Sequence, residues 1–224
     1  MSVDVDVVRN ARSKNMRLAV DPRSGRVRLT IPARASLRKA LAWAEEQRGW
    51  IEQQTAKLPA GRPFAPGAVV PLEDDEIHIV WPAPEGRRTP RLVDDRLICG
   101  GPREGLEKRV ERWFRAEALR ILSEETAEYA ERAGVHVTGV SIGDPRGRWG
   151  SCAASGSIRY SWRLILAPSF VRRATVAHEV AHRVHMNHGP AFHRFVATLF
   201  DADPAPARTW LRRHGAALHW IGKA

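Results

Sequence analysis

Residues 177–190 read Ala177-His178-Glu179-Val180-Ala181-His182-Arg183-Val184-His185-Met186-Asn187-His188-Gly189-Pro190, and they indicate a metal site. Residues four apart on an α-helix lie one turn apart on the same face, so His178 and His182 can direct two imidazoles at one point. Such nitrogens bind zinc at about 2.0–2.1 Å, and a catalytic zinc usually keeps three protein ligands and a water. Glu179 lies beside the pair, where its carboxylate can take a proton from that water. The spacing therefore predicts a metal-binding helix with Glu179 as general base.

The third ligand follows less directly from the sequence. No glutamate occurs after Glu179, which disfavours a ligand of that type from a downstream helix. His185 continues the line of the first two histidines, and three donors in a row suit a tetrahedral ion poorly. Asn187 and Gly189-Pro190 favour a helix end, so the chain can turn there and bring His188 toward the metal. We therefore favour His188. The alternatives are Asp201, Asp203 and His193.

Length and composition exclude several classes of protein. A chain of 224 residues can bury a sizeable core, and its two cysteines, Cys99 and Cys152, make no disulfide framework. The single Cys152 near the motif also disfavours a purely structural zinc, which usually has four protein ligands. There is no apolar leader at the start, and no run of about 18 apolar residues. These features predict a cytoplasmic protein with no membrane partner.

Positive charge is concentrated in the half of the chain that carries the histidines. Residues 134–224 hold 12 Lys and Arg against four acidic residues, whereas residues 1–133 hold 24 against 21. A basic C-terminal half is typical of proteins that bind nucleotides or nucleic acid. The chain also has 31 Arg and only five Lys, a bias that the base composition of a genome can produce. The charge is compatible with either explanation.

The N-terminal part reads as a β-rich unit with one helix. Apolar and polar residues alternate over residues 3–32, and Ser36 is a suitable N-cap for a helix over 37–57. A loop at 59–67 precedes strand-like runs. These runs are 68–72, 76–81 and 91–98, and an exposed loop is expected at 82–88. Gly100-Gly101-Pro102 marks the expected boundary, which gives an N-terminal domain of residues 1–101.

The C-terminal part, residues 102–224, reads as helices around a small sheet. Apolar residues recur at helical spacing over 104–133, and Gly134 is placed to stop that helix. Strands are expected at 135–142 and 158–166, and Pro168-Ser169 opens the metal helix. Further helices are expected at 190–200 and after Pro206. We therefore predict an α+β chain whose C-terminal domain is zincin-like, with a long helix, a small antiparallel sheet and the H-E-x-x-H helix.

Several motifs in fixed order resemble the YgjP-like family of predicted zinc metallopeptidases, which is related to the SprT-like domain. The motifs are Arg-Trp-Gly-Ser-Cys at 148–152, Ile-Arg-Tyr-Ser-Trp-Arg-Leu-Ile-Leu-Ala-Pro at 158–168, the H-E-V-A-H motif, and Met-Asn-His-Gly-Pro-Ala-Phe at 186–192. The resemblance implies zinc held by His178, His182 and His188, with Glu179 as base. This sequence differs from the usual family pattern at Ser161, where the family often has Asn, and at Gly189, where the family often has Ser.

Candidate substrate contacts lie near these motifs. A peptide can add as an extra strand to an exposed sheet edge, and Trp149 and Ser151 could line such a groove. The alternative is that this pentad packs a strand–helix junction. Tyr160 or Asn187 could orient the oxygen on which charge develops.

Three functions compete at this point. The first is a zinc-dependent metallopeptidase acting on a peptide or protein substrate. The second is a metal-dependent phosphohydrolase of nucleotides, because an activated water can attack phosphorus and the C-terminal half is basic. The third is a DNA-associated protease module of the SprT-like kind, which predicts binding that weakens steeply with salt.

Overall fold

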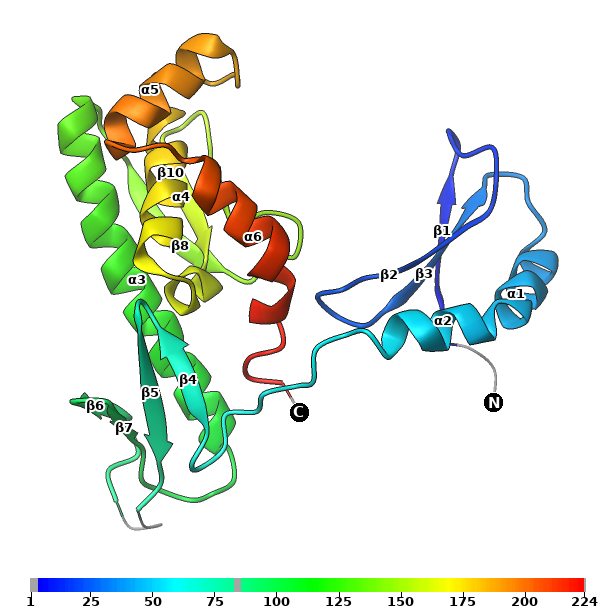
Figure 1. Ribbon diagram of the computed structural model, residues 1–224, viewed down its shortest axis with the longest axis horizontal. Coiled ribbons are helices and arrows are strands. Elements are labelled where there is room, and N and C mark those ends of the chain that lie inside the picture. Colours follow the sequence, from blue (N-terminus) through cyan, green and yellow to red (C-terminus); the bar gives the residue numbers. More distant parts are fainter. Residues whose placement is uncertain (1–3, 83–85, 224) are drawn as a thin grey trace. The chain divides into compact units, whose positions relative to one another are not determined.

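Figure 1 shows the computed structural model, which describes residues 4–82 and 86–223. The expected strand residue Val3 and part of the expected loop at 82–88 lie outside the described residues. The fold is α+β, as predicted, with three small sheets. Contacts divide the chain into two units, Met1–Ala60 and Gly61–Ala224.

The N-terminal unit is a three-stranded sheet with two short helices. Strands β1 (Asp6–Asn10), β2 (Arg17–Val20) and β3 (Val27–Pro32) are arranged in the order β1-β3-β2, with β1 parallel and β2 antiparallel to β3. Ser36 caps α1 (Leu37–Glu46), as predicted, by accepting a hydrogen bond from the Lys39 backbone N–H. The expected single helix breaks at Gln47, whose φ of −88° and ψ of 10° separate α1 from α2 (Arg48–Thr55). The described part of this unit has few buried hydrophobic residues: Val27, Leu29, Ile31, Ala40, Ala44 and Ile51.

The C-terminal unit begins with a four-stranded sheet. Its strands are β4 (Val69–Leu72), β5 (Asp75–Val80), β6 (Arg91–Val93) and β7 (Arg96–Ile98), in the order β4-β5-β7-β6. The run predicted as one strand over 91–98 is a hairpin, because the chain reverses at Asp94, which has a φ of 53°. This sheet packs on α3 (Leu106–Ala133), which ends at Gly134 with a φ of 62°, as predicted.

The observed division of the chain differs from the boundary expected after Gly101. The residues that follow Ala60 share their core with α3, not with the N-terminal sheet. The rings of Phe64 and Phe114, for example, stack with centroids 5.2 Å apart. Because Phe64 and the β4–β7 sheet bury their apolar side chains against α3, residues 61–101 belong to the C-terminal unit.

The second sheet of this unit lies beside the metal motif. Strands β8 (Gly139–Gly143), β9 (Gly150–Cys152) and β10 (Ser157–Ser161) are arranged in the order β8-β10-β9. Strand β8 is parallel to β10 and β9 is antiparallel to it, so the sheet is mixed and not purely antiparallel as expected.

The strand expected over 158–166 stops at Ser161, and this prediction was wrong in its second half. Trp162–Leu166 form a 3-10 helix (η1), which the Ser161 hydroxyl caps by accepting from the Arg163 backbone N–H. All five residues of η1 are buried. A short apolar run that is buried on every side has no periodicity by which a strand and a helical turn can be told apart.

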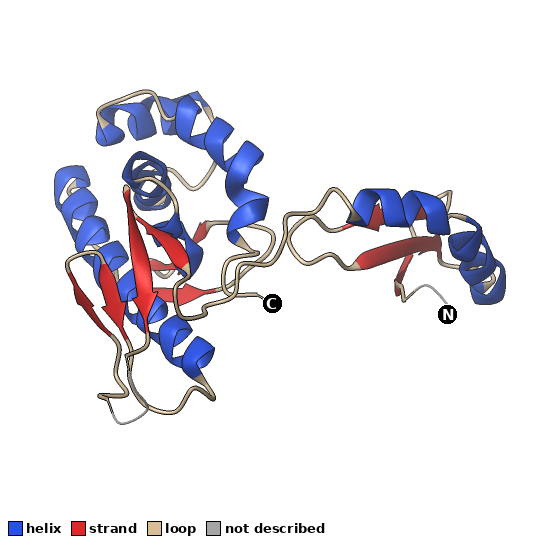
Figure 2. Ribbon diagram, turned by 60° about the horizontal axis from the view of Figure 1, so that its bottom comes forward, coloured by secondary structure: helices blue, strands red, loops and turns tan. Residues whose placement is uncertain are grey.

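Three further helices complete the unit: α4 (Ser169–Ala181), α5 (Pro190–Phe200) and α6 (Ala205–Leu218). Figure 2 shows the helices packed around the strands of this unit, and α4 contacts α3, α5, α6 and β9. The motif helix is therefore enclosed by elements from before and after it in the chain. Among the described residues, no helix combines the length and the apolar character needed to cross a membrane.

Candidate metal centre

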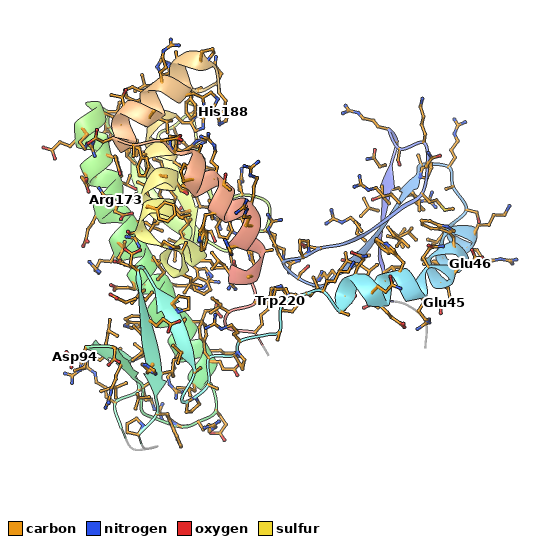
Figure 3. The ribbon with its side chains drawn as sticks, in the orientation of Figure 1. Glu45, Glu46, Asp94, Arg173, His188 and Trp220 are labelled. Atoms are coloured by element: carbon orange, nitrogen blue, oxygen red, sulfur yellow. The ribbon has the colours of Figure 1, made fainter. Side chains whose placement is uncertain are left out.

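Three imidazoles meet at the end of α4. His178 lies in the last turn of the helix, and His182 is its C-cap residue. His188, which is labelled in Figure 3, comes from the loop that leads into α5. One ring nitrogen from each of the three lies within 4.8 Å of the other two, a group that could hold a metal ion. The Nε2 atoms of His178 and His188 are 3.2 Å apart. Two nitrogens bound to one tetrahedral ion at about 2.0–2.1 Å would lie about 3.3–3.4 Å apart, so this spacing fits a shared metal.

Burial favours the neutral form of two of these imidazoles, those of His178 and His182, and the neutral form is the one that binds metals. Burial lowers the pKa of His178 to about 4, and the neighbouring rings of His182 and His188 lower it further. Burial also lowers the pKa of His182. The Nδ1 atom of His182 is 3.0 Å from the backbone carbonyl of His185. When Nδ1 carries the proton and donates it to this carbonyl, Nε2 is left free to bind a metal.

The ring of Phe192 contacts all three histidines. Its centroid lies 4.9 Å from that of His178, 4.5 Å from that of His182 and 4.8 Å from that of His188. Phe192 is fully buried in α5. The sequence placed this residue at the end of the motif at 186–192 but did not predict its contact with the imidazoles, because that contact depends on how α5 packs against α4.

Glu179 is buried next to strand β9. A Cβ atom on Gly150 would lie 2.5 Å from Glu179 Oε1, so only glycine allows the strand to pass so close to this carboxylate. Burial raises the pKa of Glu179 to about 7, while the charge of Arg148 and a hydrogen bond from the Cys152 backbone N–H oppose the rise. A carboxyl group with a pKa near 7 can exchange protons at neutral pH.

Strand β9 is the edge strand on the side of Glu179. Trp149 and Ala153 make backbone hydrogen bonds with Ser161 and Ser157, at the two ends of the β9–β10 pair. Hydrogen-bonding direction alternates along a strand, so the backbone groups of Gly150 and Cys152 point away from β10. The free edge of the sheet therefore opens toward the carboxylate of Glu179.

Comparison with known proteins identifies the family. The model of the YgjP-like, metallopeptidase domain matches residues 14–214. The chain belongs to the YgjP-like family. No curated protein and no solved structure gives a significant match to it. The resemblance inferred from the motifs is thereby confirmed, and membership indicates a hydrolase of the metallopeptidase class that acts on peptides or proteins.

The structure does not bring the other candidate ligands of this YgjP-like chain into the cluster. The ring of His185 faces Phe195, with centroids 5.7 Å apart, although its carbonyl orients His182. The rings of His188 and His193 are 6.3 Å apart, and His193 is exposed. Asp201 ends α5 in the left-handed conformation, and Asp203 accepts a hydrogen bond from the Ala205 backbone N–H at the start of α6.

The four candidate substrate residues fall into different surroundings. Tyr160 is fully buried, and its hydroxyl is 3.1 Å from the Thr126 hydroxyl on α3, so it is not placed to orient the oxygen on which charge develops, as was expected. Trp149 lines a pocket beside Glu179 and also packs against α6, where Gly215 leaves room for its ring. Ser151 is half-buried in β9, and Asn187 is exposed in the loop before His188.

Proposed function

We propose that this protein is a zinc-dependent metallopeptidase, with His178, His182 and His188 as zinc ligands and Glu179 as general base. The observation that carries the proposal is the cluster of three imidazole nitrogens beside a buried carboxylate, in a chain of the YgjP-like metallopeptidase family. Zinc is the ion that fits three neutral nitrogen ligands with one position left for chemistry. When bound, zinc would act as a Lewis acid that polarises the substrate carbonyl and lowers the pKa of water.

The residues of the chain then have distinct tasks. Glu179 accepts a proton from the attacking water and delivers it to the leaving amine. Its only hydrogen bond with a described backbone group is the one from Cys152, so the carboxylate keeps lone pairs for the water. The free edge of β9 offers the main-chain groups of Gly150 and the carbonyl of Cys152 to an extended peptide, which would align the scissile bond with the histidines.

The family match favours peptide-bond hydrolysis over nucleotide hydrolysis, and it gives no support to a nucleic-acid partner. Both rivals depended on the positive charge of residues 134–224. Several of these arginines are held by carboxylates: Arg163 by Asp144, Arg172 by Glu125 and Arg173 by Glu128. The charge of such arginines is already neutralised locally, which weakens the argument for a phosphate-binding surface.

The test is to measure metal content and turnover on the same preparation. Purified protein should contain close to one zinc per chain, cleave an unfolded protein substrate, lose cleavage after dialysis against a chelator, and recover it with added zinc. Nucleoside triphosphates serve as the rival substrate under the same conditions. Hydrolysis of triphosphates without any peptide cleavage, or a preparation without metal that is fully active, would refute the proposal.

A further inference from the structure

A pocket of about 270 Å³ opens beside the candidate metal centre. His178 and Glu179 lie on its wall, next to Trp149 and Gly150. This volume is just below the range of roughly 300–1,000 Å³ that is typical of small-molecule sites. The pocket is therefore of a size for one or two side chains, and whatever enters it is in reach of the reacting groups.

Most of the remaining lining is apolar. Ala174 comes from α4, Val196 from α5, and Ala207 and Leu211 from α6. Small residues on α4 and α6 leave room between two helices that pack against each other. Such a lining favours an apolar side chain, because burial removes its surface from water at no cost in lost hydrogen bonds.

Two exposed arginines lie on the lining of this pocket. Arg148 precedes β9, Arg208 lies on α6, and both line the pocket and are exposed. Neither makes a hydrogen bond or a salt bridge with another residue that the structure describes. Arg163, Arg172 and Arg173 are, by contrast, each held by a carboxylate.

Both guanidinium groups are close enough to affect the reacting groups electrostatically. Burial dominates at Glu179 and at His178, but Arg148 acts on the carboxylate and Arg208 on the imidazole. Glu179 is the only acidic residue on the pocket lining. Guanidinium groups bind carboxylates through paired hydrogen bonds, and two exposed arginines on the lining of a mostly apolar pocket are suited to an acidic ligand.

We propose that this pocket binds an apolar side chain of the substrate next to the scissile bond, and that Arg148 and Arg208 bind a carboxylate of the same peptide. The carboxylate is either the C-terminus of a short peptide or a neighbouring acidic side chain. The inference rests on the proposed function, because it assigns the substrate class of that same site.

Binding to the full-length protein carrying Glu179→Gln tests the proposal, since that variant should hold peptide without cleaving it. Calorimetry would compare Ac-Ala-Ala-Leu-Ala as free acid and as amide, and the amides of Ac-Ala-Ala-Leu-Glu and Ac-Ala-Ala-Leu-Gln. Charged hydrogen bonds predict that at least one acidic peptide binds about tenfold more tightly than its neutral partner. The free acid identifies the C-terminus as the source, and the glutamate peptide identifies a side chain. Replacing Leu by Ala in the better ligand should weaken binding about tenfold.

The arginine variants show whether this preference comes from the pocket. Arg148→Gln and Arg208→Gln should each reduce the preference for the acidic peptide. Arg213→Gln is the matched control, because Arg213 is exposed on the same helix as Arg208 but does not line this pocket. Equal binding of all four peptides, no binding at millimolar concentration, or a preference that survives both substitutions would overturn the proposal. Binding of ATP in the same assay without peptide binding would also overturn it.

Turnover separates this inference from the proposed function. In the wild-type sequence, Arg148→Gln and Arg208→Gln should raise KM for the acidic substrate by a larger factor than KM for the amide substrate. A fall in kcat for both substrates would instead mean that the arginines act on the reacting carbonyl, and the pocket assignment would fail alone. A protein that binds the acidic peptide but cleaves nothing would refute the proposed function and retain the pocket.

Discussion

Two glutamates of the C-terminal unit are equally buried and differently surrounded. Glu125 on α3 and Glu179 on α4 are each 6 % exposed. The Arg172 guanidinium donates hydrogen bonds to Glu125 at 2.8–3.1 Å, and Arg173 lies 3.7 Å from the same carboxylate. Glu179 has no comparable partner, only the Cys152 backbone N–H and the more distant charge of Arg148.

The difference shows how α4 can be held against α3 by ion pairs and still carry a carboxylate that is available for reaction. The arginines at the start of α4 join it to α3, and Figure 3 labels Arg173 between these two helices. Burial raises the pKa of both carboxyl groups, but at Glu125 the guanidinium groups of Arg172 and Arg173 oppose the rise and occupy the carboxylate oxygens, whereas the Glu179 carboxylate stays nearly unpaired. We infer that Glu125 serves structure and Glu179 serves reaction, and the following predictions test that division from the largest effect to the smallest.

Glu179→Gln should abolish turnover without unfolding the protein. The amide keeps the shape of the side chain but cannot accept a proton, and general bases contribute roughly 10²–10⁴-fold to rate. The measurement is kcat with an unfolded protein substrate, together with zinc content and the urea midpoint. Zinc binding and stability should be retained, so full activity in this variant would show that Glu179 is not the base.

Glu125→Gln should have the opposite profile. It leaves Arg172 buried without its main counter-charge, and removing one partner of a buried ion pair costs about 3–5 kcal/mol. Urea denaturation of the full chain would measure the loss, while kcat per folded molecule should remain near the wild-type value.

Glu124→Gln is the matched control for this prediction. Glu124 is the neighbouring residue on α3, but it pairs with Arg120 at the surface, where an ion pair contributes about 0–1 kcal/mol. Similar losses of stability in Glu124→Gln and Glu125→Gln would contradict the assignment of Glu125 to a buried ion pair that stabilises the fold.

The two glutamates also show what the sequence could and could not reveal. The H-E-x-x-H spacing is local, so His178, Glu179 and His182 were predictable from helix geometry, and His188 from the helix-ending residues around it. Arg172 and Glu125 are 47 positions apart, and no local pattern connects them. The close approach of Gly150 to the Glu179 carboxylate and the contacts of Phe192 with the three histidines also depend on how segments distant in the sequence pack together. The sequence predicted a domain boundary after Gly101 because Gly100-Gly101-Pro102 is typical of a loop. The hydrophobic core nevertheless includes residues on both sides of that loop, such as Phe64 and Phe114, so residues 61–101 belong to the C-terminal unit.

Phe192→Leu should weaken metal binding more than it weakens the fold. Leucine stays apolar and keeps much of the volume, so the loss of stability should be about 1 kcal/mol. The flat ring that orients three imidazoles is lost, however, and residues that position metal ligands typically contribute 10–100-fold to affinity. Zinc competition against a chromophoric chelator would measure the change.

Phe195→Leu gives the comparison for this substitution. Phe195 lies on the same helix and contacts the ring of His185, which is outside the cluster. Zinc affinity should be unchanged in that variant. An equal fall in affinity for both would mean that α5 as a whole, and not the Phe192 ring, supports the site.

Asp74→Ala should produce the smallest effect, at the other end of the motif helix. Asp74 lies in the turn between β4 and β5 and accepts a hydrogen bond of 2.9 Å from the Ser169 backbone N–H, so it caps α4 from outside the helix. Loss of such a cap costs about 1 kcal/mol.

Hydrogen bonds from Ser169 lower the pKa of Asp74 below 3.8. The stabilisation is therefore present above pH 3.8 and is lost as the pH falls through the lowered pKa. Urea midpoints at pH 7 and pH 3 should show a difference from wild type that shrinks at the lower pH. Asp74→Asn keeps the acceptor without the charge, so it should lose less stability than Asp74→Ala at pH 7 and should approach the wild type at pH 3. A loss at pH 7 equal to that of Asp74→Ala would show that charge, not the hydrogen bond, anchors the helix.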